Sequence, residues 1–213
     1  MSKRRIESSE GRSSKPELFS RAVTAIQQGE VIVFPTETFY GLGADALNSA
    51  AVEKVVSLKG RSLESPIAVI VADREMLEEV VTVVPPTALR LMERFWPGPL
   101  TLVLPAKENL PAPLLNPNGA VGVRISSHPV ATRLARELGR PLTATSANPS
   151  GKEPARTVEE AMGYFSGRVE IFLDGGRLEG TKGSTVVEIA DGTMKIVREG
   201  EISSEELKRV LAT

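Results

Sequence analysis

Short runs of aliphatic residues alternate along this chain with segments in which apolar residues recur with helical spacing. The first pattern is typical of buried β-strands and the second of amphipathic helices, so the chain is predicted to have an α/β fold. Several expected strands are joined by short loops instead of helices, and one such loop holds Asp191-Gly192, a dipeptide that favours a hairpin. We therefore predict a mixed, twisted sheet with flanking helices, not a purely parallel, doubly wound one.

The spacing of hydrophobic residues and the positions of capping residues predict where the helices and strands lie. Strands are predicted over residues 31–34, 67–71, 100–104, 120–125, 142–145, 171–173, 185–189 and 194–197. Helices are predicted over residues 16–28, 49–59, 74–81, 87–95 and 129–138, with two later helices opened by capping boxes at Thr157 and Ser203. The expected helix caps are Ser49 and Asp73 at N-termini and Gly29, Gly60 and Gly139 at C-termini.

The composition is that of a globular protein with one main domain. The chain has 213 residues, of which 41% are hydrophobic and 25% charged, and this length favours one large domain over two small ones. Residues 1–15 are rich in Ser, Lys, Arg and Glu and are predicted to be a flexible tail, with a basic arm that touches RNA as the alternative. Residues 16–213 are predicted to form a single domain with an aliphatic core, because only 4% of the chain is aromatic.

Several classes of site are excluded by what the sequence lacks. It contains no cysteine, which excludes disulfides, thiolate zinc sites and cysteine nucleophiles and suits a reducing cytoplasm. His128 is the only histidine and precedes a predicted helix, so we expect a capping or loop role for it and we predict no metal site. No apolar run reaches the roughly 20 residues that span a bilayer, so we expect a cytoplasmic protein without membrane contact.

Two polar segments stand at the ends of predicted strands, where α/β folds place ligands. Residues 35–43 are predicted to form a loop, in which Gly41 and Gly43 allow close backbone approach and positive φ. The alternative is a tight turn whose threonines satisfy their own backbone. Residues 143–151 leave a similar choice between an anion-binding nest and an ordinary turn.

Cationic residues near these segments suit a phosphorylated ligand. The net charge is −1, so anion binding must come from a local cluster of Lys and Arg. Lys59 and Arg61 flank Gly60 at a predicted helix end, where the helix dipole alone favours basic residues. Gly60 could nevertheless turn the chain so that both cations meet a triphosphate. Arg124 and Arg198 each stand in a predicted apolar strand, where an arginine is either paired or reaches outward.

A set of motifs covers nearly the whole chain from about Pro16. They are Pro-Thr-Glu-Thr-x-Tyr-Gly-Leu-Gly at 35–43, Lys-Gly-Arg at 59–61, Trp-Pro-Gly-Pro-Leu-Thr at 96–101, Val-Arg-Ile at 123–125, His-Pro at 128–129, Thr-Ser-Ala-Asn-x-Ser-Gly at 145–151 and Val-Arg-Glu-Gly at 197–200. In this order they resemble the YrdC-like threonylcarbamoyl-AMP synthase family in its short, single-domain form. Ser62, Ile70 and Ser126-Ser127 depart from the usual pattern, which affects fine substrate contacts and not the reaction.

The resemblance implies a YrdC/RibB-like α/β fold with a large, positively charged concave cavity. It implies that residues 16–213 are a catalytic domain that condenses L-threonine, bicarbonate or CO2, and ATP to threonylcarbamoyl-AMP and pyrophosphate, for tRNA threonylcarbamoyladenosine modification. Lys59 and Arg61 are implied as catalytic cations that neutralise the phosphates together with Mg²⁺. The implied threonine contacts are Thr38, Arg124 and Ser184. The implied ATP contacts are Lys59, Arg61, Ser65, Ser146, Asn148 and Arg198, with Tyr40 as a further cavity residue.

The resemblance also implies partners and leaves two other functions open. A downstream threonylcarbamoyl transferase would receive the product, weak tRNA or RNA binding is allowed, and the C-terminal domain of longer relatives is not expected. One alternative is an RNA-binding YrdC-like protein without synthase activity, which the near-neutral charge and the few aromatic residues disfavour. The other is a domain that adenylates a different carbamate.

Overall fold

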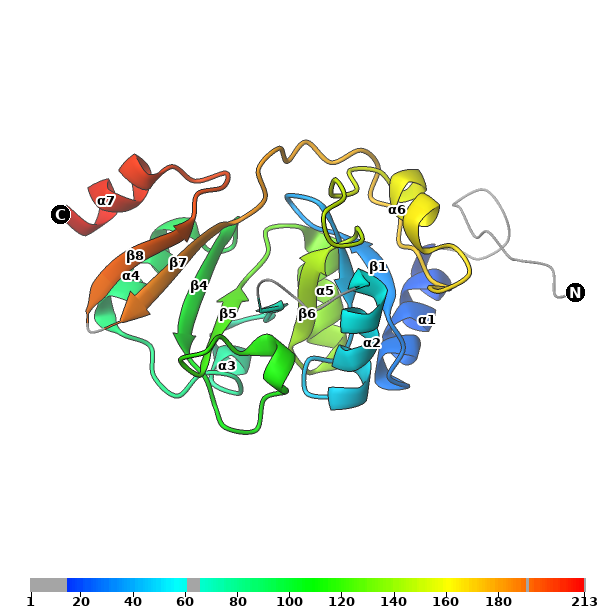
Figure 1. Cartoon of the computed structure of the whole chain (residues 1–213), viewed down its shortest axis with the longest axis horizontal. Helices are drawn as coiled ribbons and strands as arrows, with labels where there is room; N and C mark the ends of the chain where they lie inside the picture. Colours follow the sequence, from blue (N-terminus) through cyan, green and yellow to red (C-terminus); the bar gives the residue numbers. More distant parts are fainter. Residues whose placement is uncertain (1–14, 61–65, 191, 213) are drawn as a thin grey trace, which may run out of the picture.

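The computed structural model describes residues 15–60, 66–190 and 192–212, and its centre is one eight-stranded sheet (Figure 1). The strands are β1 (Ile32–Pro35), β2 (Tyr40–Gly43), β3 (Ala68–Ile70), β4 (Leu100–Pro105), β5 (Ala120–Arg124), β6 (Leu142–Ser146), β7 (Thr185–Ala190) and β8 (Thr193–Arg198). Their order is β1-β2-β6-β3-β5-β4-β7-β8. β3 pairs with β5 and β4 with β7 in parallel, and the other neighbours are antiparallel. The predicted mixed sheet is confirmed.

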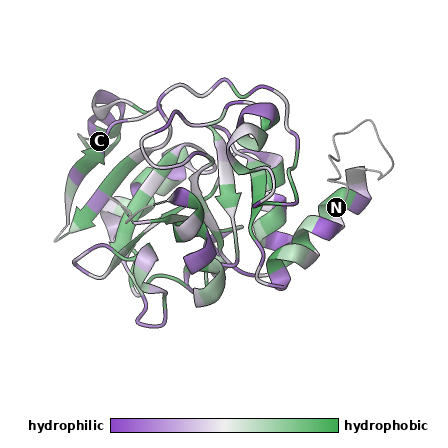
Figure 2. Cartoon of the chain, turned by 45° about the vertical axis from the view of Figure 1, so that its right-hand side comes forward, coloured by the Kyte–Doolittle hydropathy of each residue, from purple (hydrophilic) through white to green (hydrophobic). Residues whose placement is uncertain are grey.

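Helices flank this sheet. They are α1 (Lys15–Gln27), α2 (Ser49–Lys59), α3 (Arg74–Leu77), α4 (Pro86–Phe95), the 3-10 helix η1 (Ala112–Leu114), α5 (Pro129–Leu138), α6 (Val158–Phe165) and α7 (Ser204–Ala212). α1 packs against α5, and α4 packs against α7. Hydrophobic residues dominate the strands, and the buried core is mostly aliphatic (Figure 2). In the part of the chain described, no helix is both long and apolar enough to cross a membrane.

Residues 40–43, predicted as part of a loop, instead form strand β2 between β1 and β6. Neither Gly41 nor Gly43 has a positive φ, so that part of the prediction is wrong, whereas close approach is confirmed. A Cβ atom at Gly43 would lie 2.8 Å from the ring of Phe34. The two glycines therefore let this phenylalanine of β1 pack across the hairpin, which brings the turn 36–39 to the end of the sheet.

Three further sequence predictions are corrected by the structure. Residues 171–173 are not a strand, because only Phe172 forms a bridge, to β1. The N-cap of α2 is Asn48 and not Ser49, since the Asn48 side chain accepts a hydrogen bond from a backbone N–H in the first turn. α3 ends at Leu77 and does not continue to residue 81. In each case the local sequence pattern fits both the predicted and the observed structure, so it does not choose between them.

Several predicted boundaries are confirmed by hydrogen bonds and dihedral angles. Gly60 ends α2 in the left-handed region with φ 86°. Asp73 and Thr157 cap α3 and α6 through their side chains. The Ser203 side chain and the Glu206 carboxylate exchange hydrogen bonds with each other's backbone N–H, which is the predicted capping box at α7. β7 and β8 form the predicted hairpin.

Candidate active site

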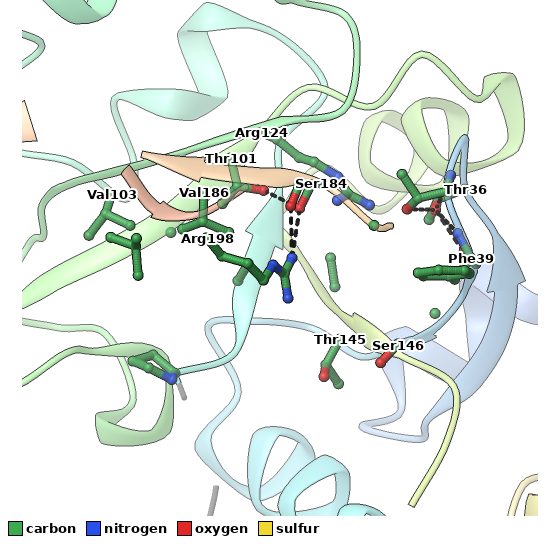
Figure 3. A pocket seen from close by; sticks show the side chains of 18 of the residues that line it. Thr36, Phe39, Thr101, Val103, Arg124, Thr145, Ser146, Ser184, Val186 and Arg198 are labelled. Carbon is green, nitrogen blue, oxygen red and sulfur yellow. Dashed lines mark hydrogen bonds between the residues drawn. The ribbon is translucent and has the colours of Figure 1, made fainter. Parts of the chain in front are cut away.

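One face of the sheet is hollowed into a cavity of about 590 Å³ (Figure 3). Its lining comes from the strands, from the turn 36–39 and from residues 182–184. Ala68, Gly122 and Ala144 face it from three neighbouring strands, and these small residues leave room for a ligand over the middle of the sheet. The charged side chains that line it are Arg124, Lys182, Glu188, Lys195 and Arg198. This balance of cations over carboxylates favours an anionic ligand.

The turn 36–39 presents hydroxyl groups to the cavity. Thr36 Oγ1 donates to the carbonyl of Phe39 over 2.7 Å and accepts from the backbone N–H of Thr38 over 3.2 Å. The two threonine hydroxyl oxygens are 3.1 Å apart. Thr36 Oγ1 donates its one proton to Phe39 and also accepts from the Phe39 backbone N–H, so Thr38 Oγ1 keeps lone pairs for a ligand. The threonines thus satisfy their own turn and also face the cavity.

Arg124 reaches the cavity from the end of β5 and is paired with a carboxylate. Its Nε lies 3.5 Å from Glu37 Oε1, and these two buried atoms have no hydrogen-bond partner. The other carboxylate oxygen of Glu37 accepts a short hydrogen bond from Ser126 Oγ. The guanidinium points into the cavity between Ser184 and Thr36 (Figure 3). Glu37 therefore faces one edge of the guanidinium, and the remaining N–H groups are left for a ligand.

Ser184 links a second arginine, Arg198, to the cavity. Its Oγ accepts a hydrogen bond of 2.9 Å from Thr101 Oγ1, and Arg198 Nη2 donates to its carbonyl oxygen over 2.9 Å (Figure 3). Partial burial, together with the nearby positive charge of Arg124, lowers the pKa of Arg198 below its ordinary value. Two guanidinium groups that repel each other across one cavity suit a ligand with more than one negative charge.

Lys59, the last residue of α2, contacts the end of β6 and does not itself line the cavity. Its ammonium donates to the carbonyl of Ser146 over 2.8 Å and lies 3.4 Å from Asn148 Oδ1. The Asn148 side-chain N–H groups donate to the carbonyls of Pro149 and Lys152, which fixes the amide. Burial lowers the pKa of Lys59 from 10.5 to about 8. An ammonium has three donors, so one remains for a ligand beyond these contacts.

The structure brings most of the predicted site residues together. Those that line the cavity are Thr38, Tyr40, Arg124, Ser146, Ser184 and Arg198. Lys59 and Asn148 are joined to this group through Ser146. Arg61 and Ser65 lie outside the described residues, so their placement stays a prediction.

His128 has the structural role expected from the sequence. Its Nδ1 accepts a hydrogen bond of 3.3 Å from the backbone N–H of Val130, which caps α5. Burial lowers the pKa of His128, and the nearby charge of Glu37 opposes that shift. Within residues 15–60, 66–190 and 192–212, no group of three His, Asp or Glu side chains could hold a metal ion.

Two side chains that shape the site were missed by the sequence analysis. Glu37 and Thr101 stand inside the motifs at 35–43 and 96–101, but a motif alone does not tell which of its members face a ligand. Strand alternation is the signal that finds Thr101, because Thr101 and Val103 point to the same face of β4 and both line the cavity. Glu37 has no such signal, since it stands in a turn.

Comparison with known proteins shows which family the chain belongs to. Residues 24–200 match the family model Sua5_yciO_yrdC, described as telomere recombination. The chain belongs to the Sua5/YciO/YrdC family. A relative of Bacillus subtilis, a threonylcarbamoyl-AMP synthase, is 39% identical over 193 residues, which cover 90% of this chain and 56% of that protein. A threonylcarbamoyl-AMP synthase of Thiobacillus denitrificans is 38% identical over 173 residues, 81% of this chain and 90% of that protein.

A solved structure of the Sua5/YciO/YrdC family has the same fold. The crystal structure of P. abyssi Sua5 complexed with L-threonine matches this chain with a TM-score of 0.88 at 36% sequence identity. The match covers 94% of this chain and 59% of the Sua5 chain. This chain therefore spans little more than half the length of the B. subtilis protein and of P. abyssi Sua5, and nearly all of the T. denitrificans protein.

Proposed function

We propose that the chain is a nucleotidyltransferase, an L-threonylcarbamoyladenylate synthase that condenses L-threonine, bicarbonate or CO2, and ATP. The observation that supports this most is the meeting of two guanidinium groups and two hydroxyls in one cavity, in a chain 36% identical to a Sua5 solved with L-threonine. The products are threonylcarbamoyl-AMP and pyrophosphate. A separate threonylcarbamoyl transferase passes the threonylcarbamoyl group to tRNA.

L-Threonine binds at the end of the cavity that Thr38, Arg124 and Ser184 line. Arg124 takes the carboxylate through the N–H groups that Glu37 does not face, since a guanidinium matches a carboxylate in a paired geometry. Thr38 Oγ1 accepts an N–H of the amino or carbamate group. Ser184 Oγ, held by Thr101, completes the contacts to the amino acid.

The nucleotide lies between Arg198 and the end of β6. The threonine amine attacks CO2 with loss of a proton, or bicarbonate with loss of water, to give a carbamate. A carbamate oxygen then attacks the α-phosphorus of ATP as pyrophosphate leaves. Both reactants are anions, so neutralisation by Lys59, Arg61 and Arg198 lowers the barrier, and positioning supplies the rest. Ser146 and Asn148 orient the phosphates and hold the Lys59 ammonium.

Mg²⁺ enters this proposal as part of the substrate. The described part of the cavity carries no cluster of carboxylates that would hold a metal by itself. In this proposal Mg²⁺ arrives bound to the phosphates of ATP, and no protein ligand is assigned to it.

The test is a pyrophosphate-release assay with each amino acid in turn, with and without bicarbonate. We expect release that requires ATP, bicarbonate and L-threonine together. Release with a different amino acid would assign the cavity to another carbamate. No release, together with salt-sensitive retention of tRNA, would mean an RNA-binding protein without synthase activity.

A further inference from the structure

Residues 174–184, which we call the strap, cross the molecule between α6 and β7 without forming a helix or strand (Figure 1). The last three residues of the strap line the cavity and include Ser184. A segment without its own ladder of hydrogen bonds is held in place by contacts with other parts of the chain, and Leu178 of the strap exchanges such bonds with Arg156. The position of Ser184 therefore depends on what anchors the strap.

The hydroxyl of Tyr40 is one such anchor. It donates to the carbonyl of Gly176 over 2.8 Å and accepts from the backbone N–H of Gly175 over 2.9 Å. The whole Tyr40 side chain is buried, at 0% exposure. Burial, with a contribution from the nearby Asp174 carboxylate, raises the pKa of Tyr40 to about 12. The phenol thus keeps its proton at neutral pH and can serve both backbone groups at once.

The residues beside Tyr40 also contact the strap. A methyl group at Gly180 would overlap the carbonyl of Thr38, so the strap lies directly on this threonine. A methyl group at Gly183 would lie 3.3 Å from the ring of Phe39. Three consecutive residues at the end of the β1–β2 hairpin therefore support the strap at three successive places.

From the other side, Glu201 holds the strap by its backbone. Its Oε1 accepts from the N–H groups of Thr181 and Lys182 over 2.6 and 2.8 Å. These backbone hydrogen bonds lower the pKa of Glu201, so the carboxylate is ionised at neutral pH. The strap is thus fixed between the hairpin and the segment after β8, with Ser184 at its cavity end.

We propose that Tyr40 is a positioning residue for the amino-acid end of the cavity. Its hydroxyl fixes the strap on the turn 36–39, and this sets where Ser184 stands relative to Thr38 and Arg124. The inference rests on the proposed function in one respect, namely that the ligand at this end is L-threonine. The attachment of the strap itself does not depend on that assignment.

The test uses Tyr40→Phe, which removes only the hydroxyl, with Tyr164→Phe as its control. Tyr164 is the other tyrosine of the chain and is half-buried on α6. In Tyr40→Phe we expect faster amide hydrogen exchange in residues 174–184 and a KM for L-threonine about tenfold higher, with kcat within about threefold and the KM for ATP unchanged. Tyr164→Phe should resemble the unmodified protein in all four measurements.

A second variant, Gly180→Ala, forces the strap off Thr38 without touching Tyr40. Gly163→Ala is its control, because a methyl group there meets nothing within 4 Å. We expect Gly180→Ala to raise the KM for L-threonine in the same way as Tyr40→Phe. Unchanged exchange in the strap and an unchanged KM in Tyr40→Phe would overturn the inference. If the unmodified protein shows no threonine-dependent turnover, the proposed function fails, and hydrogen exchange in Tyr40→Phe still decides whether Tyr40 holds the strap.

Discussion

Arg124 and Lys59, two buried cations of the candidate site, are equally hidden from solvent but differ in what balances their charge. Each residue is 6% exposed. The Arg124 guanidinium lies beside the Glu37 carboxylate, with 3.5 Å between Nε and Oε1. The Lys59 ammonium contacts only neutral oxygens among the residues that the structure describes, and burial lowers its pKa to about 8.

This difference separates two ways of preparing a cation for an anionic ligand. A buried pair such as Arg124 with Glu37 needs no ligand to balance it, because each partner offsets the desolvation of the other. A buried ammonium held by carbonyls destabilises the free protein, and a phosphate group would supply the missing counter-charge. Under the proposed function, the amino-acid end is thus organised before binding, whereas the nucleotide end is completed by its ligand.

The largest effect is expected from Lys59→Met, which removes the uncompensated charge and keeps the side-chain length. We expect kcat/KM for ATP to fall by about 100- to 1000-fold, the effect of losing one cation that stabilises a transition state. The same variant should be more stable by about 1 to 3 kcal/mol at pH 7, because a pKa lowered from 10.5 to about 8 corresponds to roughly 3 kcal/mol of desolvation. Activity is measured by pyrophosphate release and stability by urea unfolding.

Lys54→Met is the matched control for Lys59→Met. Lys54 lies on the same helix and makes an exposed ion pair of 2.8 Å with Glu30. We expect its replacement to leave activity unchanged and to alter stability by less than about 1 kcal/mol. A Lys59→Met variant that loses stability by more than this control would mean that the ammonium is compensated after all.

Arg124→Met should have the opposite effect on stability. It leaves Glu37 buried without its positive partner, and breaking a buried pair in this way costs about 3 to 5 kcal/mol. Adding Glu37→Gln to Arg124→Met should restore part of this loss, since the second change removes the unpaired charge. Both variants should have little threonine-dependent turnover. Equal stability of the single and double variants would contradict this expectation, because the Glu37 charge would then cost nothing in the absence of Arg124.

Sequence patterns predict the sheet and most of its boundaries because these follow from local rules. Gly60 ends α2 as expected, and the capping box at Ser203 forms as expected, since both depend on residues a few positions apart. Strand β2 escapes such rules. Its two glycines suggest a loop, but the segment forms a strand. The ring of Phe34 packs where side chains at Gly41 and Gly43 would lie, and this contact across the hairpin is not visible in a local pattern.

The residues of the candidate site are likewise predictable from the sequence, but the contacts between them are not. Thr38, Arg124 and Ser184 are expected from the family resemblance and meet in the cavity. The contrast between Arg124 and Lys59 is not predictable, because both are merely basic residues in a sequence. Which of them has a carboxylate beside it depends on how the turn 36–39 folds back on β5, and tertiary contacts decide that.

The smallest expected effect is a pH dependence that only the nucleotide end should show. Lys59 is protonated below its pKa of about 8 and neutral above it, so kcat/KM for ATP should fall about tenfold per pH unit above pH 8. Lys59→Arg should remove this decline, because a guanidinium stays charged. A profile in which the unmodified protein and Lys59→Arg decline together would assign the titration to another group.

The titration of Lys59 should also change the folding stability of the protein with pH, in a direction that follows from its lowered pKa. Because the pKa of Lys59 is lower in the folded protein than the 10.5 of an unfolded chain, the unfolded state holds the proton more tightly between about pH 8 and 10.5. The desolvation penalty is therefore complete below pH 8 and fades as the pH rises through this window. The stability advantage of Lys59→Met over the unmodified protein should shrink over the same range, and because other groups titrate equally in both proteins, the difference isolates Lys59. A constant advantage up to pH 10 would mean that the ammonium keeps its proton, and the contrast between the two cations would then lie in geometry alone.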